Sequence, residues 1–178
     1  MLALNVLDIR RLMAAFLKGT MFDEYLLIEG QIMTFCTFSI DGREEKSFYD
    51  GNRDAGADDQ GAESGSAGGF SQRDYIRWKA VREHCFDLIK GKRTPLFFKF
   101  VFFLPPEEMD ALLLKHGLMG MRDQLLGLCL NLRYDGTNLV LTTGSSFRSF
   151  TLDRTVDEYW DAYVRNLLVS NNILIEDV

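Results

Sequence analysis

The clearest concentration of charged side chains in the sequence lies between Arg73 and Lys99. This stretch holds eight basic residues against three acidic ones, a local charge of +5, whereas the whole chain carries −6. Basic side chains that share a surface attract phosphates and carboxylates. Cations at the end of a helix are also favoured by the macrodipole without any ligand, which is the alternative reading. The candidate residues for an anion-binding surface are Arg77, Lys79, Arg82, Lys90, Lys92 and Arg93.

The other reactive residue types form no recognisable motif. The two histidines, His84 and His116, have no partner at metal-ligand spacing, and the sequence contains neither a phosphate-binding glycine loop nor a nucleophile elbow. The Gly144-Ser145-Ser146 segment is typical of a turn rich in small polar residues. We therefore assign no catalytic, cofactor-binding or metal-binding residue, and expect no cofactor.

Composition places the chain among ordinary globular proteins. With 178 residues, 47% of them hydrophobic, it is long enough to bury a core without a metal or disulfide. Three scattered cysteines, Cys36, Cys85 and Cys129, indicate reduced and buried thiols. Because no signal peptide and no membrane-length apolar run are recognisable, we expect a cytoplasmic protein with no membrane partner.

The chain is predicted to form a single α+β domain over residues 1–178. The order of elements favours a mainly antiparallel sheet of five to six strands with about four helices packed on it. Asp41-Gly42 is interpreted as the turn of the first hairpin. The predicted helices are 6–19, 75–90, 105–116 and 155–167. The predicted strands are 25–40, 43–49, 95–104, 126–133, 139–143 and 147–152.

Residues 51–72 have a different composition from the rest of the chain. They contain six glycines and three serines, and Phe70 is their only large apolar residue. Such a segment buries too little apolar surface to offset the entropy of ordering it. We predict a disordered insertion within one domain, because the first 50 residues offer only one helix and one hairpin.

Two stretches carry a resemblance to a known family. They are TFCTFSIDGR at residues 34–43 and KGKRTPLFFKF at residues 90–100. Together with the first helix, they resemble an uncharacterised bacterial domain family without an assigned function, over most of the chain except residues 51–72. The resemblance implies no activity, cofactor or site residue.

The local charge therefore favours a non-enzymatic cytoplasmic binding module that uses the basic surface at 73–99. Its partner is expected to be anionic, either a nucleic acid or an acidic protein. Two alternatives stay open at this point. One is a small-molecule enzyme whose site has no sequence motif, and the other is a structural protein that self-associates through Phe-rich surface.

Overall fold

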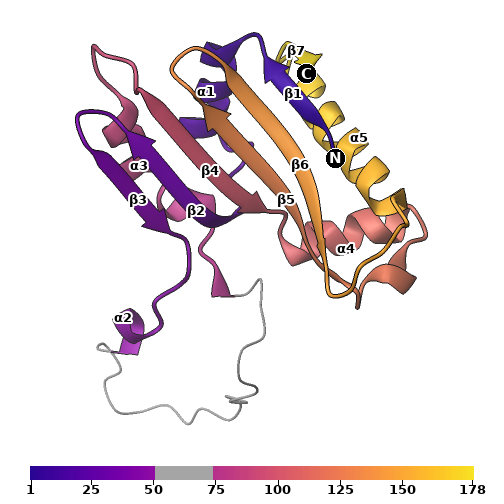
Figure 1. Ribbon diagram of the computed structural model, residues 1–178. Coiled ribbons are helices and arrows are strands. Elements are labelled where there is room, and N and C mark those ends of the chain that lie inside the picture. The colour runs from indigo at the N-terminus through magenta and orange to yellow at the C-terminus, as the bar shows by residue number, and fades with distance from the viewer. Residues whose placement is uncertain (51–73) are drawn as a thin grey trace.

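Seven strands form one antiparallel sheet in the computed structural model, which describes residues 1–50 and 74–178 (Figure 1). Their order across the sheet is β3-β2-β4-β5-β6-β1-β7. The predicted α+β class is confirmed, whereas five to six strands is too low a number. The predicted insertion at 51–72 and the basic residue Arg73 lie outside the described residues. The strands are β1 (Ala3–Val6), β2 (Leu26–Met33), β3 (Thr37–Asp41), β4 (Phe97–Phe103), β5 (Leu125–Tyr134), β6 (Leu139–Phe147) and β7 (Ile175–Asp177).

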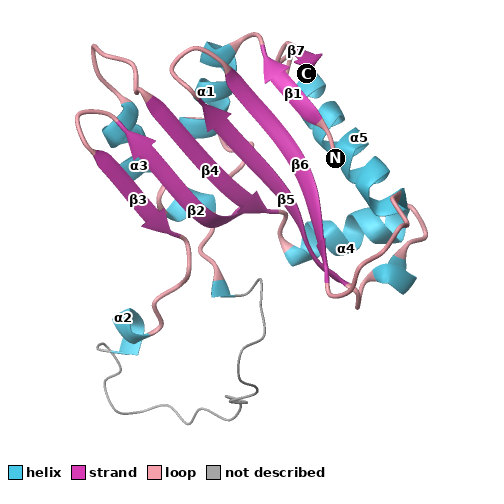
Figure 2. Ribbon diagram, in the orientation of Figure 1, coloured by secondary structure: helices cyan, strands magenta, loops and turns pink. Residues whose placement is uncertain are grey.

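The longer helices cover one face of this sheet and leave the other face open, as Figure 2 shows. They are α1 (Ile9–Leu17), α3 (Arg82–Ile89), α4 (Pro106–Lys115) and α5 (Thr155–Ser170). A one-turn helix, α2 (Ser47–Asp50), follows β3, and Trp78–Ala80 and Met119–Met121 form 3₁₀ turns. Each of the four longer helices falls within or close to a predicted one.

The first hairpin turns at residues 34–36 rather than at the predicted Asp41-Gly42. The Thr34 amide donates to the Cys36 carbonyl at 2.9 Å and closes this turn. Gly42 serves close packing instead, because a Cβ at this position would lie 1.8 Å from the Leu27 carbonyl oxygen. Because the chain turns at residues 34–36, the region predicted as one strand at 25–40 forms two strands, β2 and β3. The predicted return strand at 43–49 is wrong.

The two terminal strands, β1 and β7, raise the strand number to seven. In β1, Leu4 and Val6 alternate with half-buried residues, and β1 pairs with both β6 and β7. The first helix therefore begins at Ile9, after Asp8, whose carboxylate accepts the Arg11 amide at 3.0 Å. The predicted strand at 147–152 is also wrong, because β6 runs on to Phe147 and a loop follows.

An aromatic cluster fills the space between β4 and the helices. The Trp78 ring stacks on Phe16 with ring centroids 4.4 Å apart, and lies 5.1 and 5.4 Å from the rings of Phe100 and Phe102. The indole N–H of Trp78 donates to the Phe16 carbonyl at 2.9 Å, so this buried polar group is satisfied. The cluster fixes the chain just before α3 beneath the centre of the sheet.

Segments from both sides of the undescribed residues meet in this sheet. β2 pairs with β4 from Leu26–Phe103 to Met33–Phe97, and one hydrophobic core contains residues from Leu4 to Ile173. The single-domain organisation itself stays a prediction, which cooperative unfolding tests.

We expect the two tryptophans to report one unfolding transition. In Trp160→Phe, the fluorescence of Trp78 follows the region beneath β4, and in Trp78→Phe the fluorescence of Trp160 follows α5. Urea curves from each variant should share their midpoint with circular dichroism of the same variant. Trp78→Ala should lower the free energy of unfolding by about 3–5 kcal/mol, because it empties a fully buried site. A fluorescence midpoint that differs from the circular dichroism midpoint of the same variant would show two independently folding parts.

Candidate functional site

The six candidate basic residues fall into two groups with different surroundings. Arg77, Lys79 and Arg82 lie beside the loop between α1 and β2, and their charges meet carboxylates there. Both Arg77 and Lys79 pair with Glu24, the latter at 2.8 Å between Nζ and Oε1. The structure therefore uses this group to tie the chain around Trp78 to the preceding loop.

Arg82 is the most enclosed member of the first group. Its side chain is 17% exposed and its partner Asp23 is 16% exposed, with 2.6 Å between Arg82 Nη1 and Asp23 Oδ1. The same nitrogen donates to the Gly19 carbonyl. At Glu24, the carboxylate that Arg77 and Lys79 share, hydrogen bonds from Lys79 and Arg77 lower the pKa of the carboxyl group.

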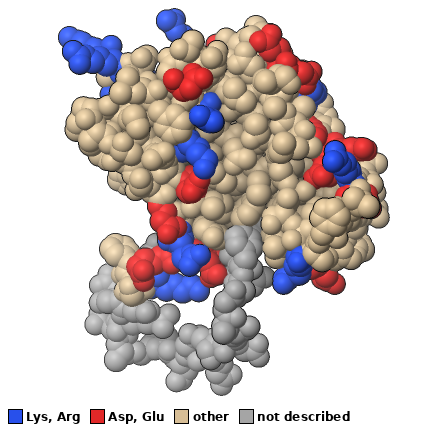
Figure 3. All heavy atoms as spheres, viewed as in Figure 1, with Lys and Arg blue, Asp and Glu red and all other residues tan. Residues whose placement is uncertain are grey.

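Lys90, Lys92 and Arg93 form the second group, at the loop that joins α3 to β4. Lys90 pairs with Asp87 one turn earlier at 2.7 Å and lies 5.7 Å from the ring centroid of Phe86. Lys92 and Arg93 are exposed and make no ion pair with any residue that the structure describes. Figure 3 shows Lys and Arg side chains standing out at the upper left, where Figure 1 places this loop.

A pocket of about 580 Å³ lies between this loop and the β2–β3 turn. We call it the turn pocket; its lining residues are Thr34, Phe35, Asp87, Leu88, Ile89, Lys90, Gly91, Lys92, Arg93, Thr94 and Leu96. Phe35 is 92% exposed and Leu96 63% exposed, so apolar surface lies beside the unpaired cations. The buried hydroxyl oxygen of Thr34 has no hydrogen-bond partner among the described residues.

Backbone hydrogen bonds hold both walls of the turn pocket in place. The Leu96 amide donates to the Met33 carbonyl at 2.9 Å and so attaches the loop to the end of β2. The Lys90 amide donates to the Phe86 carbonyl at 2.8 Å and ends α3. The basic side chains that follow the end of α3 therefore lie next to the turn that carries Phe35.

Sequence reasoning found the cations of this pocket but missed its apolar part. It placed Leu96 within a strand beginning at residue 95, whereas β4 begins at Phe97. It also placed Phe35 within the predicted strand at 25–40, whereas Phe35 lies in the turn between β2 and β3. Cys36 follows it and is exposed, so the prediction of three buried thiols is wrong for this residue.

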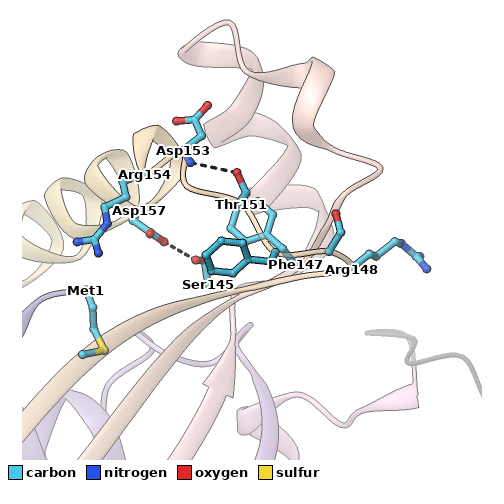
Figure 4. A pocket seen from close by; sticks show the side chains of 10 residues that line it. Met1, Ser145, Phe147, Arg148, Thr151, Asp153, Arg154 and Asp157 are labelled. Carbon is cyan, nitrogen blue, oxygen red and sulfur yellow. Dashed lines mark hydrogen bonds between the residues drawn. The ribbon is translucent and has the colours of Figure 1, made fainter.

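A second pocket lies between the end of β6 and the start of α5 (Figure 4). The Ser145 hydroxyl donates to Asp157, and Arg148 points away from Arg154 in this view. Among the described residues, no histidine or lysine lines this pocket, and the N-terminal ammonium of Met1, which does, pairs with Asp161 at 3.2 Å. The two arginines do not converge on a common point where an anion could sit.

A third pocket, of about 430 Å³, contains a hydrogen-bonded tyrosine and carboxylate. Tyr163 donates to Glu108 at 3.1 Å between oxygens. Burial, with the negative charge of Glu108, raises the pKa of Tyr163 to about 12. The phenol therefore stays protonated at neutral pH and acts as a hydrogen-bond donor.

Within residues 1–50 and 74–178, no three His, Cys, Asp or Glu side chains are grouped so that they could hold a metal ion. Among the helices of these same residues, none combines the length and the apolar character needed to cross a membrane.

Thiol labelling tests the exposure of the β2–β3 turn. At mildly alkaline pH, a thiol reagent should modify Cys36 rapidly and leave Cys85 and Cys129 unmodified, because burial raises the pKa of both to about 12. The Cys36→Ser variant should show no fast phase, and urea should release the other two thiols. Rapid modification of more than one thiol in the native protein would contradict this arrangement.

The two groups of cations should differ in their effect on stability. Arg82→Ala should lower the free energy of unfolding by about 1–3 kcal/mol, because it leaves Asp23 partly buried without its partner. Arg93→Ala should change it by less than about 0.5 kcal/mol, because the side chain is exposed and unpaired. If urea denaturation gave an equal loss in the free energy of unfolding for the two variants, both groups of cations would be structural.

Comparison with models of protein families identifies the family of this chain. The model of a family described as "Family of unknown function (DUF5721)" matches residues 15–176. This confirms the resemblance to a family without an assigned function that the two sequence stretches indicated. No curated protein and no solved structure matches the chain.

Proposed function

We propose that this chain, which belongs to the family of unknown function DUF5721, is a non-enzymatic cytoplasmic binding module whose anionic partner docks at the turn pocket. The observation that carries the proposal is the exposure of Lys92 and Arg93 without any ion pair among the described residues, beside exposed Phe35 and Leu96. A partner with carboxylates and a hydrophobic side chain can bind such a surface, because its carboxylates pair with the exposed cations and its apolar side chain covers the exposed apolar residues.

The chemistry favours an acidic protein segment over a nucleic acid. A nucleic acid is held by a row of phosphate contacts, and this surface offers only Lys90, Lys92 and Arg93 on a chain whose net charge is −6. The other three candidates, from Arg77 to Arg82, already meet carboxylates. A short acidic peptide needs few cations, and its hydrophobic side chain can cover Phe35 and Leu96.

Binding of a defined acidic peptide tests the proposal. The probe is a fluorescein-labelled peptide in which Glu and Leu alternate, measured by fluorescence anisotropy at two salt concentrations. It should bind more weakly at the higher salt, because the pairs that it forms are near the surface. The double variant Lys92→Glu and Arg93→Glu should weaken binding by about 10–100-fold, since two attractions become repulsions.

The control variant makes the same charge change elsewhere. Lys115 ends α4 and Arg154 precedes α5, and both are exposed without an ion pair among residues 1–50 and 74–178. The double variant Lys115→Glu and Arg154→Glu should bind the peptide at least about tenfold more tightly than the pocket variant does. Salt screens exposed charges that lie far from the bound peptide, so a change of charge there has little effect on binding. Equal losses in both variants would refute the turn pocket. Binding of oligothymidine but not of the peptide would refute an acidic protein partner.

A further inference from the structure

Strand β3 forms one edge of the sheet, and the pattern of its hydrogen bonds defines which backbone groups face outward. Gly42 donates its amide to the Ile28 carbonyl at 3.0 Å, on the β2 side. Bonding to β2 alternates along an antiparallel strand, so Ile40 and Phe38, opposite Gly30 and Ile32, also direct their backbone groups to β2. The amides and carbonyls of Thr37, Ser39 and Asp41 therefore point away from the sheet.

This outer edge is unpaired within the described parts of the chain. β3 pairs only with β2 there, and Thr37, Ser39 and Asp41 are exposed. The strand has no proline, no lysine and no bulge against β2, and Asp41, at its far end from the turn, is its one charged residue. The edge ends at Arg43, whose amide donates to the Asp41 carboxylate at 2.9 Å.

The edge leads directly into the turn pocket. The first residue of β3, Thr37, follows the turn at residues 34–36, and that turn forms one wall of the pocket. An extended chain lying along β3 and continuing past Thr37 reaches the turn that carries exposed Phe35, and Lys92 and Arg93 line the same pocket as Phe35. The other end of the edge carries Arg43 and Lys46 among the carboxylates of Asp41, Asp74 and the adjacent glutamates. Lys92 and Arg93, at the turn end, have no carboxylate partner among the described residues.

We propose that the acidic partner binds as an added strand along the outer edge of β3, with its carboxylates at the turn pocket. This inference rests on the proposed function and specifies its binding mode. Backbone hydrogen bonds to Thr37, Ser39 and Asp41 supply affinity, and the pocket supplies selectivity for acidic and apolar side chains. A second copy of the chain is a poorer occupant, because two molecules of charge −6 repel each other.

Amide hydrogen exchange, read by NMR with the alternating Glu–Leu peptide, tests this binding mode. In the free protein the amides of Thr37, Ser39 and Asp41 should exchange rapidly, and those of Phe38 and Ile40 slowly. In the complex the first three should slow by about tenfold or more, as each gains a strand hydrogen bond, while the other two stay as they were. Peptide binding without this alternating pattern would overturn strand addition and leave the proposed function standing.

Ser39→Pro provides a second readout, with Ser39→Ala as its matched control. Proline removes the outward amide without touching a bond to β2, and edge strands tolerate it. Peptide affinity should fall by about tenfold in Ser39→Pro and stay within about twofold in Ser39→Ala. Equal affinities in folded variants would overturn the proposal; should Ser39→Pro fail to fold, the exchange pattern of the wild type decides.

Two other outcomes identify a different occupant or a failed premise. A dimer of the free protein in light scattering that Ser39→Pro converts to a monomer would assign the edge to a second copy and overturn the peptide strand. If the alternating peptide does not bind the wild type at all, the proposed function fails, and the added strand fails with it.

Discussion

Packing of Trp78 between α1 and the aromatic face of β4 is the interaction on which the arrangement of the rest depends. The indole is fully buried, stacks on Phe16 and donates its N–H to the carbonyl of the same residue. Trp78 lies just before α3, so its packing fixes the position at which that helix starts. Because α3 has about two turns, the position of its end is then fixed as well. The direction of α3 then places the loop at residues 90–94 against the β2–β3 turn.

The same packing separates basic residues that are close in sequence into two roles. Arg77, Lys79 and Arg82 flank the buried tryptophan and therefore lie near the polar loop at Asp23 and Glu24, where leaving a carboxylate unpaired would be costly. Lys92 and Arg93 lie beyond the end of α3 and outside the reach of that loop. A +5 stretch of sequence thus contains a structural set of ion pairs and a smaller set, Lys92 and Arg93, without a carboxylate partner among the described residues.

The strongly periodic elements could be predicted from the sequence, and the short ones could not. β4, β5 and α5 are long and alternate or repeat clearly, so their approximate ranges follow from pattern alone. β1 and β7 have four and three residues, too few to show a period; β1 forms on the edge that β6 offers, and β7 on the edge that β1 offers. Asp41-Gly42 gave a misleading turn signal because Gly42 is required by contact with Leu27, a constraint that only the folded chain reveals.

At the candidate site, the cations were visible in the sequence but their availability was not. Whether Arg82 or Arg93 is free depends on which carboxylates the fold brings near, and Asp23 is 59 residues away from Arg82 in the chain.

The most direct measurement of the central claim is chemical-shift mapping of the isotope-labelled protein during titration with the alternating peptide. Large amide shifts are predicted at residues 34–36 and 90–94, with Arg77 and Arg82 unchanged. Shifts centred on residues 77–82, or on the pocket at Ser145 and Asp157, would contradict the account.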